Sequence, residues 1–300
     1  MKTLRTIVVA WVIVLLAASL LPAQLEVPQH EAPGQDVERD EAREDLREQL
    51  FTFAVFADAQ PYGRQFTPEL VEIATRVGRS DVAFVIGAGD YIDGSSNQAT
   101  VRRQWNNFFT ALAPLQAMRE IPVALAPGNH DISGVRRNAE IFCEHFDRLY
   151  FSFDYQGCHF VVLDSETIGA DARVTGKQLE WLKQDLADAR DAKFTFVAMH
   201  RPLFPVDGNI GYSLDKHPKE RDALHALFVE SGVNAVFHGH EHLYHHQERD
   251  GIHYFITGGA GAKPYVEPEN GGFHHYLLVS VEDDGFVVEV QRVSPSEPTN

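Results

Sequence analysis

Basic residues are scarce in this 300-residue chain, which has 26 lysines and arginines against 43 aspartates and glutamates. The formal net charge at pH 7 is therefore −17. Nucleic acid and anionic membrane surfaces would both be repelled by such a field, so the composition argues against either as the partner. A small anionic substrate remains compatible with this charge if its binding site carries cations.

Cysteine is also scarce, with Cys143 and Cys158 as the only two. They lie close in the sequence, and an oxidising compartment would permit a bridge between them. The other interpretation is two unpaired thiols that are buried as small apolar side chains. The sequence leaves both interpretations open.

The N-terminal apolar run, residues 7–18, is shorter than the roughly 20 residues that a membrane span needs. It follows Lys2 and Arg5 and leads into a segment with the small residues Ser19 and Ala23. These features are typical of a secretory signal peptide. We expect residues 1–23 to be this signal, or an uncleaved anchor, and the protein to be periplasmic or extracellular.

The rest of the chain lacks internal repeats and predicts one large domain. Residues 24–49 contain the charged stretch "DVERDEAREDLREQL", which is typical of a linker or a solvated surface helix. Residues 50–294 form the predicted domain, which is long enough to bury a sizeable core. Residues 295–300 are expected to be a frayed tail.

Apolar strands alternate with amphipathic helices along most of this domain. We predict strands at 51–57, 82–88, 121–126, 194–199 and 233–237, with helices at 69–79, 98–118, 136–149, 176–190 and 220–230. A hairpin joins 150–154 to 158–164 through Gln156-Gly157, and four more strands follow at 244–249, 252–257, 276–281 and 286–293. The alternation predicts an α/β fold whose ligands gather at the carboxyl ends of the strands.

Polar side chains follow five of these strands at the point where each strand ends. In chain order the clusters are Asp58-x-Gln60, Gly89-Asp90-x-x-Asp93, Gly128-Asn129-His130-Asp131, His200 and Gly239-His240-x-His242. Each cluster alone has a simpler explanation, because aspartates after strands often cap helices and single histidines are often structural. Together they would bring carboxylate, amide and imidazole donors to one edge, and these donors suit zinc, iron or manganese. The sequence therefore predicts a metal centre.

The ordered set resembles the pattern of the calcineurin-like metallophosphoesterases, which runs D-x-H, G-D-x-x-D, G-N-H-D/E, H and G-H-x-H. The resemblance spans residues 51–281, and the segments "YFSFDYQGCHFVVLDSE" and "YFITGGAGA" are similar to the exported, purple-acid-phosphatase-like branches. It implies a four-layer αββα sandwich, in which two mixed β-sheets pack face to face with helices outside.

The resemblance also implies roles for the matching residues. Two metal ions (Mn, Fe or Zn) would be held by Asp90 as the bridge, by Asp58, Gln60 and His242 at one site, and by Asn129, His200 and His240 at the other. Such a pair can clamp a phosphoryl group and lower the pKa of a bridging water, which then attacks phosphorus. His130 would stand near the leaving-group oxygen as a proton or hydrogen-bond donor, and Asp131 would orient it.

Two positions depart from the family pattern. Gln60 stands where most members have histidine, so one metal has a neutral amide ligand; some branches carry glutamine here, and we interpret it as a subgroup mark. Asp93 stands where purple acid phosphatases have the tyrosinate that colours their iron, and Tyr91 lies two residues too early. We therefore predict a colourless enzyme.

Other polar residues near the clusters receive no firm role. Arg201 has two open interpretations, a bidentate contact with substrate phosphate or a pair with an acidic neighbour. His238, His245 and His246 are expected at surface or strand positions. His274 and His275 could line the pocket, and the simpler interpretation places them in a solvated loop.

We therefore expect a binuclear metal-dependent hydrolase of small phosphoesters, either a phosphomonoesterase or a phosphodiesterase. Gln60 leaves open a nucleotide-pyrophosphatase-type phosphoanhydride hydrolase. The alternative from another class is a catalytically silent module of the same fold that binds metal or phosphate, and the presence of His130 and Asp131 argues against it. No nucleic-acid polymer is expected as a partner, and a membrane only if the N-terminal segment is uncleaved.

Overall fold

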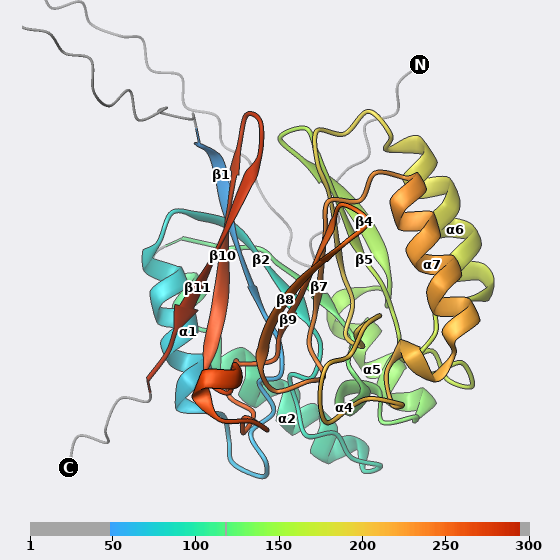
Figure 1. Cartoon of the computed structure of the whole chain (residues 1–300). Helices are drawn as coiled ribbons and strands as arrows, with labels where there is room; N and C mark the ends of the chain where they lie inside the picture. Colours follow the sequence, from blue (N-terminus) through green and yellow to red (C-terminus); the bar gives the residue numbers. More distant parts are fainter. Residues whose placement is uncertain (1–48, 118, 295–300) are drawn as a thin grey trace, which may run out of the picture.

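The computed structural model describes residues 49–117 and 119–294 (Figure 1). The predicted signal peptide, the charged linker up to residue 48 and the C-terminal tail lie outside the described residues. The strands are β1 (Gln49–Phe56), β2 (Val82–Ala88), β3 (Val123–Ala126), β4 (Phe151–Tyr155), β5 (Cys158–Val162), β6 (Thr195–Ala198), β7 (Ala235–His238), β8 (Tyr244–Arg249), β9 (Ile252–Thr257), β10 (His275–Glu282) and β11 (Phe286–Arg292). The α-helices are α1 (Pro68–Arg79), α2 (Gln98–Ala111), α3 (Pro114–Ala117), α4 (Asn129–Ile132), α5 (Arg136–Phe146), α6 (Gly176–Asp188) and α7 (Pro218–Glu230).

The strands form two mixed sheets. One sheet has the order β11-β10-β1-β2-β3, and the other has the order β4-β5-β6-β7-β9-β8. Strands β1, β2 and β3 are parallel to one another, and so are β5, β6, β7 and β9. In the second sheet the parallel strands form the centre, and β4 and β8 are antiparallel edge strands. In the first sheet the parallel strands β1, β2 and β3 form one side, and β10 and β11 continue the sheet in antiparallel pairs on the other. The carboxyl ends of the parallel strands lie along one edge of each sheet.

The two sheets pack face to face through an aromatic core. Residues alternate along each strand, so Phe53 of β1 faces Phe160, Phe196 and Phe237 of the other sheet, with ring centroids 5.3–6.1 Å apart. These edge-to-face contacts are the favourable geometry for aromatic pairs. The central strands are buried on both faces, which explains why they are continuous apolar runs.

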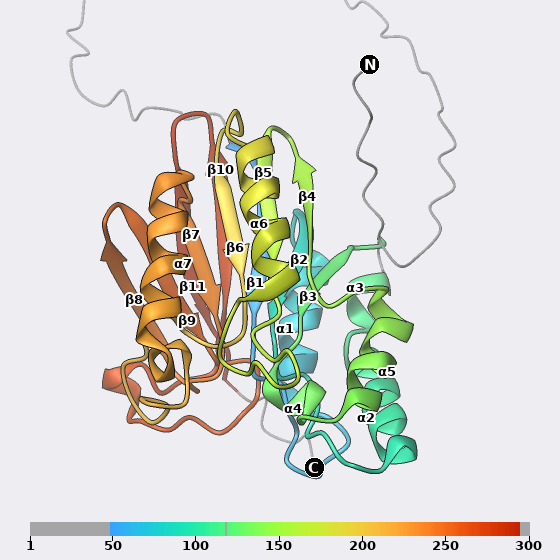
Figure 2. The same cartoon turned by 90° about the vertical axis from the view of Figure 1, so that its right-hand side faces the viewer.

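Helices cover the outer face of each sheet (Figures 1 and 2). Helices α1, α2 and α5 pack on the first sheet around the fully buried Trp105. Helices α6 and α7 pack on the second sheet through Leu182, Leu186, Leu224 and Phe228. The architecture is therefore the predicted four-layer αββα sandwich.

The predicted helix at 98–118 is wrong in its extent. Helix α2 ends at Ala111, and a separate short helix, α3, begins at Pro114. Proline lacks the backbone N–H and disfavours the helical conformation of the residue before it, so the chain turns here. Both cysteines are free thiols in the structure, and Cys158 is buried between the sheets.

A buried histidine joins helix α6 to the β4–β5 hairpin. The Nδ1 atom of His159 lies 2.7 Å from Oδ1 of Asp154, and its Nε2 atom lies 3.0 Å from Oδ2 of Asp185. The side chains of His159 and Asp185 are 2% and 3% exposed. Burial lowers the pKa of His159, but the hydrogen bonds and charges of the two aspartates outweigh it and raise the pKa overall.

No helix among residues 49–117 and 119–294 has the length and apolar character that a membrane crossing requires.

Candidate metal centre

The candidate residues come from the carboxyl ends of five parallel strands in both sheets. Strands β1, β2 and β3 deliver Asp58, Asp90 and Asn129, while β6 and β7 deliver His200 and His240. Since the two sheets are packed face to face with these ends on the same side, the loops from both sheets converge at one edge, the lower side of Figure 1. Sequence-distant residues thereby become neighbours.

Three of these residues hold an unusual backbone conformation. Asp58, Asp90 and His240 have φ values of 60°, 61° and 72°, in the left-handed region that side chains with a Cβ rarely adopt. Each such residue costs about 1–3 kcal/mol, and such strain concentrates at functional sites. Hydrogen bonds between the loops hold the conformation, including one from the backbone N of Asp58 to the carbonyl O of Gly89 at 3.0 Å.

One group of donors is centred on the Nε2 atom of His242. This atom lies 3.4 Å from Oδ1 of Asp58 and 3.2 Å from Nε2 of Gln60. The opposite ring nitrogen, Nδ1, donates to the carbonyl O of Lys263 at 3.0 Å. Because a carbonyl can only accept, this bond places the proton on Nδ1 and turns the Nε2 lone pair toward Asp58 and Gln60.

A second group is centred on the Nε2 atom of His200. It lies 3.0 Å from Oδ1 of Asn129, 3.2 Å from Nδ1 of His240 and 3.4 Å from Oδ2 of Asp90. The Nδ1 atom of His200 donates to the carbonyl O of Ala88 at 2.9 Å. The two groups adjoin, because Asp58, Asp90 and His200 offer ligand atoms that all lie within 4.8 Å of one another.

The cluster is buried and strongly polarised. Asp58 is 0% exposed and Asp90 is 2% exposed. Burial lowers the pKa of His200, yet the charge and hydrogen bond of Asp90 raise it to about 10. Burial likewise raises the pKa of Asp90, and His200 reverses this and holds it below its usual range. Paired buried carboxylates attract positive charge, so the site favours cations.

Gln60 fits a ligand role because part of its side chain lacks a partner. The residue is fully buried, and its Oε1 atom accepts no hydrogen bond from the described residues. An unsatisfied buried amide oxygen costs about 1–3 kcal/mol. A cation held beside Asp58 and His242 would satisfy it. The carboxylate, amide and imidazole set therefore fits two metal ions of the Mn, Fe or Zn type.

His130 lies at the mouth of the cluster. Its Nδ1 atom donates to the carbonyl O of Asp93 at 3.0 Å, and its Nε2 atom lies 4.0 Å from Oδ2 of Asp90. The side chain is 39% exposed, unlike the buried donors. Burial lowers the pKa of His130, but Asp90 and the Asp93 carbonyl outweigh this and raise it.

The expected contact between Asp131 and the His130 ring is replaced by a different one. The carboxylate of Asp131 accepts backbone N–H groups from Asp90 at 2.9 Å, Tyr91 at 3.0 Å and Gly128 at 2.8 Å. Burial and the charge of Asp90 raise the pKa of Asp131 to about 7, against these hydrogen bonds. Asp131 therefore fixes the backbone of the Asp90 loop, and the Asp93 carbonyl orients His130.

Neither Asp93 nor Tyr91 directs its side chain to the cluster as a donor. The Asp93 carboxylate accepts the backbone N–H groups of Tyr62 and Gly63 at 2.7 and 2.6 Å. The Tyr91 hydroxyl accepts from the backbone N of Gly89 and donates to the carbonyl O of Ala126, each at 2.9 Å. The predicted absence of colour stays a prediction.

The structure confirms one of the two interpretations of Arg201, the pair with an acidic neighbour. Its guanidinium forms a bidentate pair with Glu166, with Nε–Oε1 and Nη2–Oε2 distances of 2.7 and 2.9 Å. The side chains are 13% and 4% exposed. The remaining nitrogen, Nη1, donates to the carbonyl O of Tyr212 and lies 3.5 Å from Nε2 of His240. Arg201 thus supports the wall of the site.

Glu241 is a positioning residue that the sequence patterns did not reveal. It lies between two candidate ligands, is fully buried, and accepts the backbone N–H groups of Val206 and Asp207 at 2.9 and 2.8 Å. The same loop returns to the site through Asn209, whose amide donates to the carbonyl O of His240 at 2.5 Å. The one available signal was an acidic residue between two histidines of "HGHEH".

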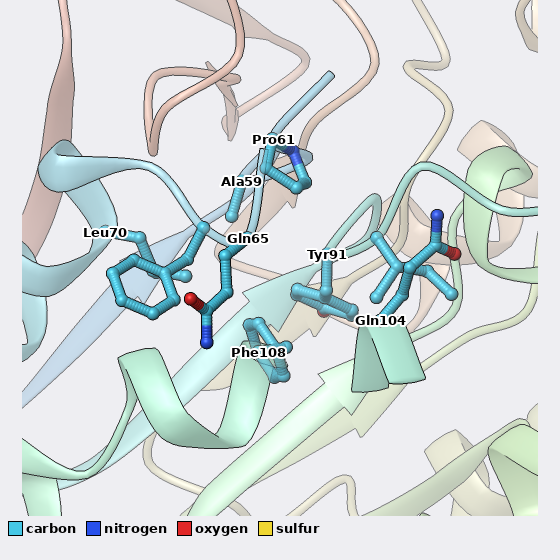
Figure 3. Close-up of a pocket in the computed structure, with 9 residues that line it drawn as sticks. Ala59, Pro61, Gln65, Leu70, Tyr91, Gln104 and Phe108 are labelled. Atoms are coloured by element: carbon cyan, nitrogen blue, oxygen red, sulfur yellow. The ribbon is translucent and has the colours of Figure 1, made fainter. Parts of the chain in front are cut away.

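Of the flanking histidines, two lie in strands and are fully buried. His238 lies in β7, where burial lowers its pKa to about 3, and burial lowers the pKa of His275 in β10 to about 4. The solvated loop expected for His275 is therefore wrong, because the residue begins a strand that is covered by its neighbours. A small pocket is lined by Ala59, Leu70, Tyr91 and Phe108, among others (Figure 3). It has room for about one water molecule. Its lining lacks carboxylate and imidazole groups, so it offers no ligands of these kinds to a metal ion.

A family model described as calcineurin-like phosphoesterase matches residues 51–244, which include all seven candidate metal ligands. The chain belongs to this family.

The chain is also similar in sequence to individual phosphatases. Human serine/threonine-protein phosphatase CPPED1 is 28% identical over 187 residues, covering 59% of this chain and 59% of that protein. Purple acid phosphatase 23 of Arabidopsis thaliana is 29% identical over 205 residues, covering 62% of this chain and 41% of that protein. The matched part of the chain thus spans about three fifths or less of these relatives' length.

Solved structures of phosphatases share the fold. Purple acid phosphatase PPD1 from yellow lupin (Lupinus luteus) seeds matches with a TM-score of 0.66 at 18% identity, covering 81% of this chain and 51% of that one. A dimetal phosphatase from Danio rerio matches with a TM-score of 0.61 at 15% identity, covering 83% of this chain and 100% of that one. At these identities the likeness establishes the calcineurin-like phosphoesterase fold.

Proposed function

We propose that this chain is a binuclear metal-dependent hydrolase of small phosphoesters. The observation that carries the proposal is the division of the donors, all buried except the half-buried Asn129, into two adjoining groups. Asp58, Gln60 and His242 form one, and Asn129, His200 and His240 form the other, with Asp90 between them. A centre of this kind provides two ligand sets and a shared carboxylate.

When bound, a metal pair at this centre would neutralise the charge on phosphoryl oxygens and activate water for in-line attack on phosphorus. The protein contributes fixed donors. The carbonyl groups of Lys263 and Ala88 set the tautomers of His242 and His200, and Asp131 holds the loop of Asp90. Donors fixed in this way need no reorganisation when substrate enters.

His130 is placed to assist departure of the leaving group. The carbonyl O of Asp93 holds the Nδ1 proton, so the Nε2 atom is the one that faces the cluster from its solvent side. In the protonated ring, Nε2–H would donate to the departing oxygen, a contribution that is typically about 10²–10⁴-fold in rate.

Hydrolysis of p-nitrophenyl phosphate and bis-p-nitrophenyl phosphate tests the proposal, with metal content measured on the same Mn-, Zn- or Fe-loaded protein. The pair also separates monoester from diester activity, and a nucleotide pyrophosphate extends the panel to phosphoanhydrides. His130→Ala should keep two metals and lose about 10²-fold or more in rate, whereas His240→Ala should lose metal. Two bound metals without turnover on any substrate would favour a silent binding module instead.

We further propose that the protein is exported, with a membrane contact only if residues 1–23 remain attached. The support is the basic start, short apolar run and small residues of that segment. N-terminal sequencing of protein recovered outside the cytoplasm tests this. A mature N-terminus near residue 20 or 24 agrees with it, and retention of the intact chain inside the cell contradicts it.

A further inference from the structure

Exposed apolar side chains gather on the loops that also carry the metal centre. Seven large hydrophobic residues are exposed in the described parts of the chain, and five of them lie on loops that leave the carboxyl ends of the parallel strands. We call this set the apolar rim: Tyr62, Ile168, Ile210, Tyr212 and Tyr265. Exposed apolar groups that collect at one place mark interaction sites more often than scattered ones do.

Two tyrosines of the rim flank one candidate ligand. The Tyr265 ring stacks on the His242 ring, with centroids 4.1 Å apart and planes at 23°. The Tyr62 ring meets the same imidazole edge-on at 6.4 Å. Their hydroxyls lie 3.3 Å from Nε2 and 3.3 Å from Nδ1 of His242. Both rings therefore stand within one side-chain length of the place where a phosphoryl group would bind.

These rings are held in place although they are exposed. The carboxylate of Asp93 accepts the backbone N–H of Tyr62 at 2.7 Å, and the backbone N of Tyr265 donates to the carbonyl O of His242 at 3.2 Å. The two side chains are nevertheless 51% and 50% exposed. An aromatic surface whose backbone is fixed loses little entropy when it binds a ligand.

Two cations of the rim loops are already paired with carboxylates. Arg201 is paired with Glu166, and Lys216 is paired with Asp171 at 2.9 Å, so these two cations of the rim loops are already compensated. The chain as a whole carries −17. Arg64 and Lys263 also lie on the rim loops, so it is the net charge of the chain that disfavours a leaving group with further phosphates or carboxylates relative to a flat neutral ring.

We propose that the apolar rim binds an uncharged aromatic leaving group, which makes aryl and arylmethyl phosphoesters the preferred substrate class. This inference rests on the proposed phosphoester hydrolysis. The phosphoryl group occupies the metal centre, and the leaving group packs against the rings of Tyr62 and Tyr265. The short distance from these rings to His242 selects a ring that is attached to the phosphoester oxygen directly or through one carbon.

Calorimetric titration of the Mn-loaded protein with three phosphonates tests the inference independently of turnover. Benzylphosphonate and cyclohexylmethylphosphonate have similar size but differ in aromaticity, and methylphosphonate reports on the phosphoryl site alone. Stacking should make benzylphosphonate bind about twofold to tenfold more tightly than its saturated analogue. Tyr265→Leu and Tyr62→Leu should each reduce this preference.

Two further variants serve as controls. Tyr265→Phe keeps the ring and should keep the preference. Val287 lies on β11, is 45% exposed and pairs with Ser280, at the end of the sheet opposite to the metal centre. Val287→Ser should therefore leave the preference for benzylphosphonate unchanged. Circular dichroism confirms that each variant is folded.

The outcomes separate the inference from the function. Equal binding of benzylphosphonate and cyclohexylmethylphosphonate would overturn the inference, and so would a preference for benzylphosphonate that survives both leucine variants. If methylphosphonate still binds in either case, the proposed function stands. If methylphosphonate does not bind to protein that holds two metals, the proposed function and the inference both fail.

Discussion

Substitution of Gly239 by alanine should disturb the metal centre more than its size suggests. A Cβ atom at this position would overlap a carboxylate oxygen of Asp58 and approach the Cβ of Ala57 at 2.7 Å and the carbonyl O of Ala88 at 2.8 Å. Real Cβ atoms do not make such contacts, and two of the three neighbours are backbone or fixed to it. The β7 loop must therefore move away from β1 and β2.

Overpacking of this kind costs roughly 1–3 kcal/mol. For a domain of this size each kcal/mol lowers the melting temperature by about 2–4 °C, so the expected loss is about 2–12 °C. Asp58 also accepts the backbone N–H of His240 at 2.9 Å, so a shift separates two candidate ligands at once. A displacement of about 1 Å at a reactive centre can reduce the rate by about 10²-fold.

Thermal melts followed by circular dichroism, with and without chelator, measure the stability, and metal analysis measures the stoichiometry. Gly208→Ala is the matched control, because Gly208 is exposed and its added Cβ would meet only Tyr265 at an ordinary 3.6 Å. We expect the control to stay within about 0.5 kcal/mol of the original protein. If Gly239→Ala melts within 1 °C of the original and still binds two metals, the close approach of these loops is not required.

Three other perturbations test other parts of the structure. The two aspartate partners of His159 raise its pKa, so its contribution to the free energy of unfolding is fully present below about pH 6.5 and is lost as pH rises through the folded-state pKa. In urea denaturation, His159→Gln should therefore lower the stability by about 3 kcal/mol at pH 6 and by less at pH 9. A loss of stability that does not depend on pH would refute the charged form of His159. Glu241→Gln replaces one carboxylate oxygen with an NH₂ group and leaves one backbone N–H of the loop unpaired. We expect a loss of about 1–3 kcal/mol in stability and faster hydrogen exchange in residues 203–213. Unchanged exchange in these residues would contradict the positioning role of Glu241. Arg201→Met and Glu166→Gln should each lower the free energy of unfolding by about 3 kcal/mol, because each leaves a buried charge without its partner. The double variant should lose less than the sum of the two. Strict additivity in this double-mutant cycle would show that the pair is not coupled.

The fold could be predicted because its signals are local. Continuous apolar runs such as residues 82–88 are buried on both faces, and the strand–helix rhythm fixes which ends of the strands carry polar residues. The error at 98–118 also has a local cause, because Pro114 interrupts a periodicity that otherwise continues. The positions of the candidate ligands follow from the rule that ligands gather at the carboxyl ends of parallel strands.

The contacts of individual polar side chains could not be predicted in the same way. Asp131 follows His130 in the sequence, yet its carboxylate turns to the backbone of Asp90, 41 residues earlier. Arg201 pairs with Glu166 across 35 residues, and Asp93 reaches the backbone of Tyr62 across 31. Residue types show what each group can bind, but the partner depends on which loops the packed sheets bring together.

The sequence by itself thus determined the layers of the sandwich and the identity of the residues at its edge, because burial and backbone periodicity act over neighbouring residues. Only the tertiary structure divided the donors into two groups, turned Asp131 away from His130, gave Glu241 its loop and set Tyr62 and Tyr265 on either side of His242. Those arrangements depend on the approach of two sheets within about 10 Å and on distances of a few ångströms between side chains, which no local pattern encodes.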